Sequence, residues 1–190
     1  MTIVITGASR GIGATLAAQY KDAGEEVIGT ARGAGAVLDV TDPASHTAFA
    51  ANLQGRPLDL LICNAGVYVD KGDDLDTGFG PDLWAQSFAT NVTGVFLTVQ
   101  SLMPNLRAAK GAKIAIIASQ MGSQTRAPGG SYIYRASKAA VINLGRNLAV
   151  DLKSEGIAVG IYHPGWVRTD MGGDQGEISV AESAQGLAQR

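Results

Sequence analysis

Short apolar runs alternate with helix-like segments along the whole chain. The runs are rich in β-branched residues and nearly continuous in hydrophobicity, which is typical of strands buried on both faces of a parallel sheet. The predicted strands cover residues 2–6, 26–30, 36–38, 58–63, 113–119 and 157–162. Helical patterns lie between these runs, so the sequence predicts repeated strand–helix–strand units.

Helices are predicted where apolar residues recur every three to four positions. The signals are the spacing of Ile12, Leu16, Tyr20 and Ala23, an N-cap at Asp42 before Pro43, and a capping box of Ser179 and Glu182. A long helix is predicted over residues 83–109, and we expect Pro104 to kink or break it. A further helix opens near Ser131 and ends before Gly156.

This alternation predicts an α/β fold with a Rossmann-like, doubly wound parallel sheet in three α/β/α layers. A length of 190 residues fits one domain that spans residues 1–190, and a composition that is 46% hydrophobic is sufficient to bury a core. In such sheets ligands bind beyond the carboxyl ends of the strands. Candidate functional residues are therefore expected directly after strands or on a helix that faces this edge of the sheet.

Composition argues against several classes of protein. A formal net charge of −2 and the lack of a Lys/Arg cluster argue against a nucleic-acid partner. The lone cysteine, Cys63, lies in an apolar run and is interpreted as a buried hydrophobe. Two histidines and one cysteine, far apart in sequence, lack the spacing of metal ligands. The first residues do not have the pattern of a signal peptide, and no apolar run approaches ~18 residues, so we expect a cytoplasmic protein without a membrane segment.

Residues 6–13 join the first predicted strand to the first helix with the sequence TGASRGIG. Gly7 can supply a tight turn, Gly11 lets the backbone approach a pyrophosphate, and Gly13 lets the helix pack closely on the sheet. The helix N-terminus then presents N–H groups to the phosphates. The alternative is an ordinary glycine turn, but the position after the first strand favours dinucleotide binding.

The end of the second predicted strand bears on the choice of nicotinamide cofactor. An acidic residue at this point binds the ribose 2′-hydroxyl of NAD. Here the sequence is Gly29-Thr30-Ala31-Arg32, with no carboxylate. Arg32, and Arg10 in the glycine loop, can instead bind a 2′-phosphate, the alternative being two solvated surface arginines. NADP(H) is therefore favoured over NAD(H).

Tyr134 and Lys138 are four residues apart in a predicted helix, so their side chains project from one face. An ammonium beside a phenol favours the phenolate, and we expect the pKa of Tyr134 to fall from about 10 towards working pH. Such a phenol is suited to general acid/base work on an alcohol or a carbonyl. Ser119, at the end of a predicted strand, can hydrogen-bond an oxygen on which charge develops. Each residue alone has a structural explanation, whereas the combination points to catalysis.

The combination resembles the short-chain dehydrogenase/reductase family from Thr2 to about Met171. The motifs that carry the resemblance are Thr6-Gly7-x-x-x-Gly11-x-Gly13, Asn64-Ala65-Gly66, Asn91-Val92-Thr93-Gly94, Ser119, Tyr134-x-x-x-Lys138 and Pro164-Gly165-Trp166-Val167-Arg168-Thr169. The pattern is similar to small NADP(H)-dependent carbonyl reductases of the C-factor/sniffer type. It implies an oxidoreductase that moves a hydride between NADP(H) and a small carbonyl or secondary alcohol. It also implies a homodimer or homotetramer formed through the long helices.

The resemblance implies a role for each motif residue. Asn91, Ser119, Tyr134 and Lys138 correspond to a catalytic tetrad, in which Tyr134 is the general acid/base and Asn91 holds a water that links Lys138 to solvent. The implied cofactor-binding residues are Gly7, Ser9, Arg10, Gly11, Ile12, Gly13, Arg32, Asp39, Val40, Asn64, Ala65, Gly66, Tyr134, Lys138, Pro164, Gly165, Val167 and Thr169.

The chain departs from the family pattern at two places. The segment between Arg32 and Asp39 is short, so we expect an abbreviated third strand. Members of the family usually continue beyond the last predicted helix with a strand that completes the sheet. We expect the sheet to lack this final strand, and a truncated chain is one explanation.

The expected substrate pocket has an aromatic and methionine lining, which suits an apolar ketone or aldehyde. The candidates, each of which could also be core, are Gln120, Met121, Tyr68, Tyr132, Trp166 and Met171. His163 is interpreted as structural. The alternative function is an NADP(H)-binding sensor or signalling protein without turnover. The Tyr134–Lys138 pair argues against a sensor, because a sensor needs no proton donor.

Overall fold

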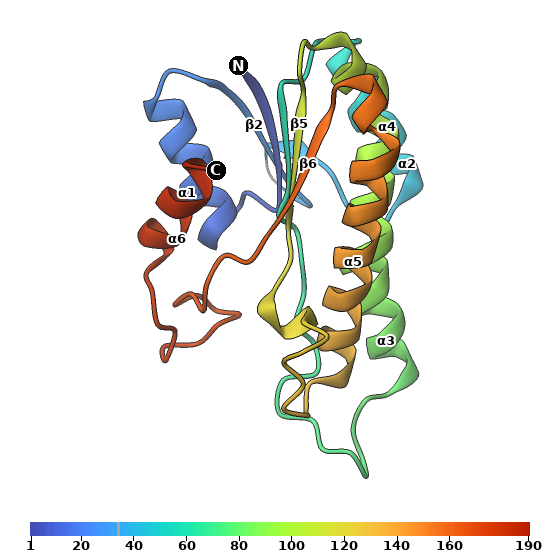
Figure 1. Ribbon diagram of the computed structural model, residues 1–190, viewed down its shortest axis with the longest axis vertical. Coiled ribbons are helices and arrows are strands. Elements are labelled where there is room, and N and C mark those ends of the chain that lie inside the picture. Colours follow the sequence, from blue (N-terminus) through green and yellow to red (C-terminus); the bar gives the residue numbers. More distant parts are fainter. Residues whose placement is uncertain (34) are drawn as a thin grey trace.

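A twisted sheet of six parallel strands lies at the centre of the described chain, with helices on both of its faces (Figure 1). The computed structural model describes residues 1–33 and 35–190. The strands are β1 (Thr2–Thr6), β2 (Glu26–Ala31), β3 (Ala36–Val37), β4 (Leu60–Cys63), β5 (Lys113–Ile117) and β6 (Ala158–Tyr162). Their order in the sheet is β3-β2-β1-β4-β5-β6, so the winding reverses between β1 and β4. This confirms the predicted Rossmann-like, doubly wound α/β sheet.

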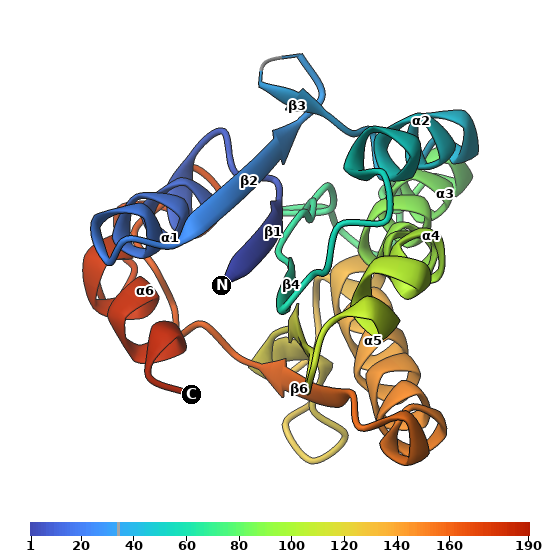
Figure 2. The ribbon, with the colours of Figure 1, turned by 90° about the horizontal axis from the view of Figure 1, so that it is seen from above.

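The helices form one layer on each face of the sheet. They are α1 (Gly11–Asp22), α2 (Pro43–Leu53), α3 (Pro81–Phe88), α4 (Gly94–Ala108), α5 (Tyr132–Asp151) and α6 (Val180–Ala188). Figure 2, the view from above, shows α1 and α6 on one side and α2, α3, α4 and α5 on the other. The three predicted layers are therefore present. Within the described ranges, every helix is too short or too polar to cross a lipid bilayer.

Strand β1 supplies side chains to the cores on both faces of the sheet. Ile3, Val4 and Ile5 are fully buried. Because successive side chains of a strand point to opposite faces, Ile3 and Ile5 pack with Leu16 of α1, whereas Val4 joins the larger core that contains Leu102 of α4. Burial of each such side chain is worth about 1.5–3 kcal/mol. The packing of β1 therefore holds the glycine loop that follows it in place.

The observed strands agree with the predicted ones to within two residues. Strand β4 begins two residues later than predicted, because the N–H of Leu58 donates to Asn105 O at 3.0 Å instead of pairing within the sheet. Strand β5 ends two residues early, because the Ser119 hydroxyl accepts the N–H of Met121 at 3.1 Å and opens a 3₁₀ turn, Gln120–Gly122. Strand β3 has only two residues, as expected for an abbreviated third strand.

The long helix predicted over residues 83–109 is divided into three parts. Helix α3 is followed by one turn of π-helix, Ala89–Thr93, and then by α4. Pro104 lies inside α4, which continues to Ala108, so Pro104 does not break the helix, and the alternative that it kinks the helix stays a prediction. The interruption falls instead at the π turn, a feature that is frequent at functional sites. This turn contains Asn91.

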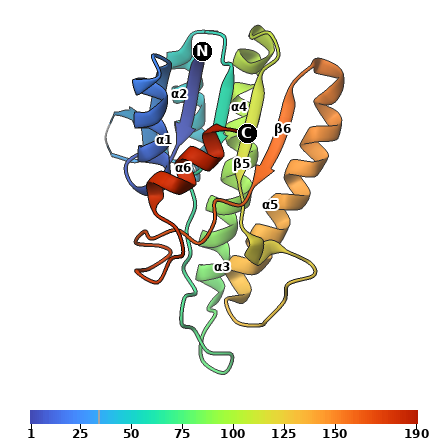
Figure 3. The same ribbon diagram turned by 60° about the vertical axis from the view of Figure 1, so that its left-hand side comes forward.

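Three long loops gather at the carboxyl edge of the sheet, as Figures 1 and 3 show. They cover residues 64–80 after β4, 118–131 after β5 and 163–179 after β6. Helix α6 then packs on α1, and its predicted capping box of Ser179 and Glu182 is confirmed. These loops build most of the walls of the site described next.

Candidate active site

Two adjoining cavities open at the carboxyl edge of the sheet. The first has a volume of about 700 Å³ and lies between the glycine loop, the ends of β2 and β4, and α5. The second has a volume of about 670 Å³ and lies between the loops after β4, β5 and β6. Both are lined by Tyr134, together with Ile12, Ala118, Pro164, Thr169 and Met171. Tyr134 therefore lies at the junction of the two cavities.

The glycine loop borders the first cavity. Gly7 and Gly11 have φ angles of 66° and 55°, in the left-handed region that glycine adopts without strain. A Cβ on Gly13 would lie 2.4 Å from Gly7 O, so only glycine allows α1 to pack this closely on the loop. The N-cap residue of α1, Arg10, makes no side-chain cap hydrogen bond. The first N–H groups of α1 are therefore suited to an anion.

Thr6 and Asn64 join the glycine loop to the end of β4. The Asn64 Nδ2 group donates to Thr6 O at 3.0 Å and to Gly7 O at 3.1 Å. In return, Thr6 Oγ1 accepts the N–H groups of Asn64 and Ala65, both at 3.0 Å. The Asn64-Ala65-Gly66 motif therefore fixes the carboxyl ends of β1 and β4 relative to each other beside the cavity.

Most of the predicted cofactor-binding residues line the first cavity. They are Gly7, Ser9, Arg10, Gly11, Ile12, Arg32, Asp39, Val40, Asn64, Ala65, Gly66, Tyr134, Lys138, Pro164 and Thr169. Gly165 and Val167 line the second cavity instead, and Gly13 packs behind the glycine loop. Gln86 of α3 and Thr90 of the π turn also line the first cavity. The sequence analysis missed these two because no motif marks them.

The two arginines predicted to bind a 2′-phosphate are in different environments. Arg10 donates to the carboxylate of Asp170, and both side chains are exposed. Arg32 is exposed beyond β2, where its charge contributes to the lowered pKa of Asp39. Hydrogen bonds from Thr41 are the larger cause of that lowered pKa. Because Arg10 forms an ion pair with Asp170, Arg32 is the stronger candidate for binding the anionic 2′-phosphate.

Tyr134 and Lys138 face each other on the buried side of α5. Tyr134 is 7% exposed and Lys138 is 5% exposed. The Lys138 Nζ lies 5.6 Å from the centroid of the Tyr134 ring and donates to Ile117 O, at the end of β5, at 3.1 Å. The i, i+4 spacing therefore brings the two side chains together as predicted, and β5 holds the ammonium in place.

Burial dominates the pKa of Tyr134. Burial raises this pKa to about 12, hydrogen bonding with Ser119 lowers it, and Tyr68 and Asp70 raise it. Burial also lowers the pKa of Lys138, to about 8. The expected fall of the Tyr134 pKa towards working pH was therefore wrong for the chain by itself. The reason is that burial removes the hydration of the phenolate, and this effect exceeds the opposing effect of the hydrogen bond with Ser119.

Asn91 is buried beside the same pair of residues. Its Nδ2 group donates to Val67 O at 2.9 Å and to Ser137 Oγ at 3.0 Å, and its Oδ1 atom accepts the N–H of Val67 at 2.9 Å. A Cβ on Gly66 would lie 3.3 Å from Asn91 Oδ1 and 3.6 Å from Lys138 Nζ. Asn91 therefore ties the loop after β4 to α5, and a side chain at position 66 would crowd both Asn91 and the lysine.

The second cavity contains Ser119 and most of the expected pocket residues. Those that line it are Tyr68, Gln120, Met121, Trp166 and Met171. Tyr132 is not among them: it is 41% exposed and packs edge-on against Phe79, with ring centroids 5.0 Å apart. His163, interpreted from sequence as structural, also lines the cavity, and partial burial lowers its pKa.

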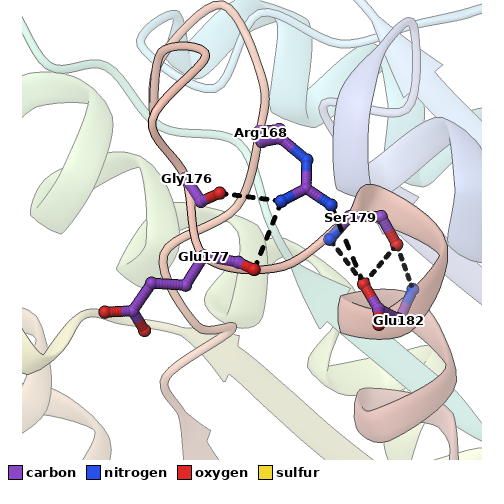
Figure 4. A network of polar contacts seen from close by, with 5 residues as sticks. All are labelled: Arg168, Gly176, Glu177, Ser179 and Glu182. Atoms are coloured by element: carbon purple, nitrogen blue, oxygen red, sulfur yellow. Dashed lines mark hydrogen bonds and ion pairs between the residues drawn. The ribbon is translucent and has the colours of Figure 1, made fainter.

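Arg168 closes the base of the loop that forms one wall of the second cavity (Figure 4). Its Nη1 donates to Gly176 O at 2.8 Å and to Glu177 O at 3.2 Å, and its backbone N–H donates to Ile178 O at 3.0 Å. Its Nη2 lies 4.0 Å from the Glu182 carboxylate of the α6 capping box. The wall is thereby joined to the first turn of α6.

In the part of the chain that the structure describes, no group of His, Cys, Asp and Glu is placed to hold a metal ion.

Comparisons with known proteins place the chain in a family. The short chain dehydrogenase family matches residues 34–178. The C-signal protein of Myxococcus xanthus is 36% identical over 149 residues, which cover 74% of this chain and 84% of that protein. A carbonyl reductase from chicken fatty liver, in a structure with bound NADPH, is 29% identical with a TM-score of 0.89, and the match covers 99% of this chain and 89% of that chain.

A further structure shares the fold. The carbonyl reductase Sniffer of D. melanogaster has a TM-score of 0.91 at 24% identity, and the match covers 99% of this chain and 90% of that chain. The chain belongs to the short-chain dehydrogenase family, an oxidoreductase family, and the resemblance noted from its motifs is confirmed.

Proposed function

We propose that this chain is an NADP(H)-dependent carbonyl reductase in which Tyr134 protonates the carbonyl oxygen. The observation that carries the proposal is the position of Tyr134, which lines both the cavity of the glycine loop and the adjoining cavity. A phenol at this junction can reach a substrate oxygen in one cavity while the cofactor lies in the other. Such positioning converts a bimolecular encounter into a reaction between groups already in place.

The residues of the first cavity fit a nicotinamide dinucleotide. The uncapped N-terminus of α1 and the glycine loop would hold the pyrophosphate, and Arg32 would bind a 2′-phosphate. The bound NADPH of the chicken carbonyl reductase supports NADP(H) over NAD(H). The chemistry that this cofactor supplies is a hydride for the carbonyl carbon.

The chain's own residues supply the proton and hold the oxygen. With a pKa raised to about 12, Tyr134 is protonated throughout the neutral range, so it is prepared to act as an acid in carbonyl reduction. Ser119 lines the second cavity and would donate a hydrogen bond to the same oxygen. The ammonium of Lys138 would stabilise the phenolate left after proton transfer. Asn91 would complete the tetrad by holding a water beside Lys138.

The lining of the second cavity favours an apolar ketone or aldehyde as substrate. Its walls include the side chains of Tyr68, Met121, Trp166 and Met171. Apolar surfaces with a few convergent polar groups are typical of pockets for small organic molecules. Here Ser119 and the Tyr134 hydroxyl supply two of those polar groups, and Lys71 and Asp174 are among the other polar residues that line the cavity.

The test is NADPH consumption by the purified chain with a panel of aldehydes and ketones. We expect carbonyl-dependent oxidation of NADPH, and a slower reaction with NADH at equal concentration. Tight NADPH binding without turnover on any carbonyl would favour the sensor instead. We also propose that the chain forms a homodimer or homotetramer through α4 and α5. Light scattering of the same sample tests this oligomeric state.

A further inference from the structure

The loop after β4 holds the first turn of α5 through side chains of its own. Asp70 is 1% exposed, and its carboxylate accepts the N–H of Ile133 at 2.8 Å and the N–H of Tyr134 at 3.2 Å. The ring of Tyr68 stacks on that of Tyr134, with centroids 4.3 Å apart and planes inclined by 19°. The hydroxyls of Tyr68 and Ser131 are 2.5 Å apart. All these contacts end on the residue proposed as the acid or on its neighbours in the chain.

Helix α5 cannot cap itself in the usual way. Its N-cap residue, Ser131, has a φ of 47°, in the left-handed region, and makes no side-chain cap hydrogen bond. The Ser131 hydroxyl is instead bonded to Tyr68. Asp70 therefore caps the N-terminus of α5, although it lies about sixty positions earlier in the chain. The helix dipole favours the negative charge of Asp70 at this end.

We propose that Tyr68 and Asp70 are positioning residues that hold the Tyr134 hydroxyl at the junction of the two cavities. The inference rests on the proposed function of Tyr134 as the acid. A cap from within the helix would satisfy the N–H groups equally well, but it would not fix α5 relative to the substrate cavity. Tyr68 also lines that cavity, so the ring that positions the acid lies in the substrate wall.

The pKa of Tyr134 distinguishes a positioning role of Asp70 from a purely structural one, because it depends on the groups around the phenol. The groups that face it are Tyr68 and Asp70 from the loop after β4, Ser119 from the turn after β5, and Lys138 from its own helix. His163 lies farther along the wall of the second cavity. The charge of Asp70 contributes to the raised pKa of Tyr134, so removal of the carboxylate should lower that pKa.

The experiment compares Asp70→Asn with Asp74→Asn as a matched control. Asp74 is in the same loop and carries the same charge, but its carboxylate accepts the N–H groups of Asp76 and Thr77, both at 3.0 Å, within the loop itself. For each variant we would measure kcat for NADPH-driven carbonyl reduction and the ultraviolet phenolate titration of Tyr134, taken as the difference from a matched Tyr134→Phe background. Asp70→Asn should lower kcat by about 10²-fold, the effect of a misplacement of about 1 Å, and should move the titration to lower pH. Asp74→Asn should change neither.

Tyr68→Phe is the second variant, for use if Asp70→Asn does not fold. It keeps the stacked ring and removes only the hydroxyl bonded to Ser131. We expect a decrease in kcat of about 5-fold, the effect of one hydrogen bond, with NADPH affinity unchanged.

Two different failures can be told apart. If Asp70→Asn, or Tyr68→Phe in its place, keeps the wild-type kcat, or changes only the melting temperature, the inference is wrong. If the wild-type chain reduces no carbonyl, the proposed function is wrong and the inference loses its basis. The titration of Tyr134 needs no substrate, so it shows whether Asp70 acts on the phenol in either case.

Discussion

Burial and hydrogen bonding act in opposite directions on the Tyr134 hydroxyl. Burial raises its pKa to about 12, whereas hydrogen bonding with Ser119 lowers it, and the neutral phenol is the favoured form. The spacing of Tyr134 and Lys138 could be read from the sequence, and so could their shared helix face. The direction of the pKa shift could not, because it depends on how completely side chains distant in sequence enclose the ring.

We predict that Tyr134 in the cofactor-free protein titrates near pH 12 rather than at its ordinary pKa of 10.0. Since the pKa is higher in the folded chain than in the unfolded one, this group's contribution to stability is fully present below pH 10. It is lost as the pH rises from 10 towards 12. The measurement is the phenolate absorbance of the wild type minus that of Tyr134→Phe. A transition below pH 10 would contradict the burial argument.

We propose that the choice between NADPH and NADH also depends on a single side chain. Arg32→Asp replaces a cation suited to a 2′-phosphate with a carboxylate suited to a ribose hydroxyl. We predict that KM for NADPH rises by at least about 10-fold while KM for NADH changes little, since the loss of a charge-assisted hydrogen bond costs about 1.5–3 kcal/mol. Steady-state kinetics with each cofactor provide the check, and equal changes for both cofactors would exclude this role.

At the scale of elements, strands were easier to predict than the ends of strands and the loops. Buried parallel strands are short, apolar and β-branched, so all six could be recognised within two residues. The π turn at Ala89–Thr93 could not be predicted, because its residues continue the helical pattern of their neighbours. Asp70 was missed because loops lack periodicity and its partners, Ile133 and Tyr134, are more than sixty positions away.

The contact between α1 and the glycine loop leads to a prediction about Gly13. A Cβ here would lie 2.4 Å from Gly7 O and 2.5 Å from Asn64 Nδ2. Gly13→Ala should therefore lower the free energy of unfolding by about 1–3 kcal/mol, the usual cost of overpacking, and weaken NADPH binding. Denaturant unfolding and cofactor titration measure the two effects.

Gly186→Ala is the matched control for that substitution. Gly186 lies in α6, and a Cβ there would have no neighbour within 4 Å. The alanine should be neutral or stabilise the fold by up to about 1 kcal/mol, because alanine is the better helix former. A Gly13→Ala variant as stable as Gly186→Ala would show that the close approach of α1 is not needed.

For the whole molecule, the sheet topology brings together residues from the entire chain. The glycine loop after β1, the motif after β4, Ser119 after β5 and Pro164 after β6 meet because parallel strands place their carboxyl ends at one edge. This convergence could be predicted from the alternation of strands and helices, which indicates a parallel sheet with its ligand site at that edge. The shape of the second cavity could not, because it depends on the path of the loop of residues 163–179, which has a motif at its start but no hydrophobic periodicity that predicts its path.

The most direct test of the account is the kcat of Tyr134→Phe in NADPH-driven carbonyl reduction. The variant keeps the ring that stacks on Tyr68 and removes only the hydroxyl at the junction of the cavities. We predict that kcat falls by about 10²–10⁴-fold, the contribution of a positioned general acid, while NADPH affinity stays within a factor of about two. A variant that turns over carbonyl substrate at the wild-type rate would contradict the assignment of Tyr134 as the proton donor.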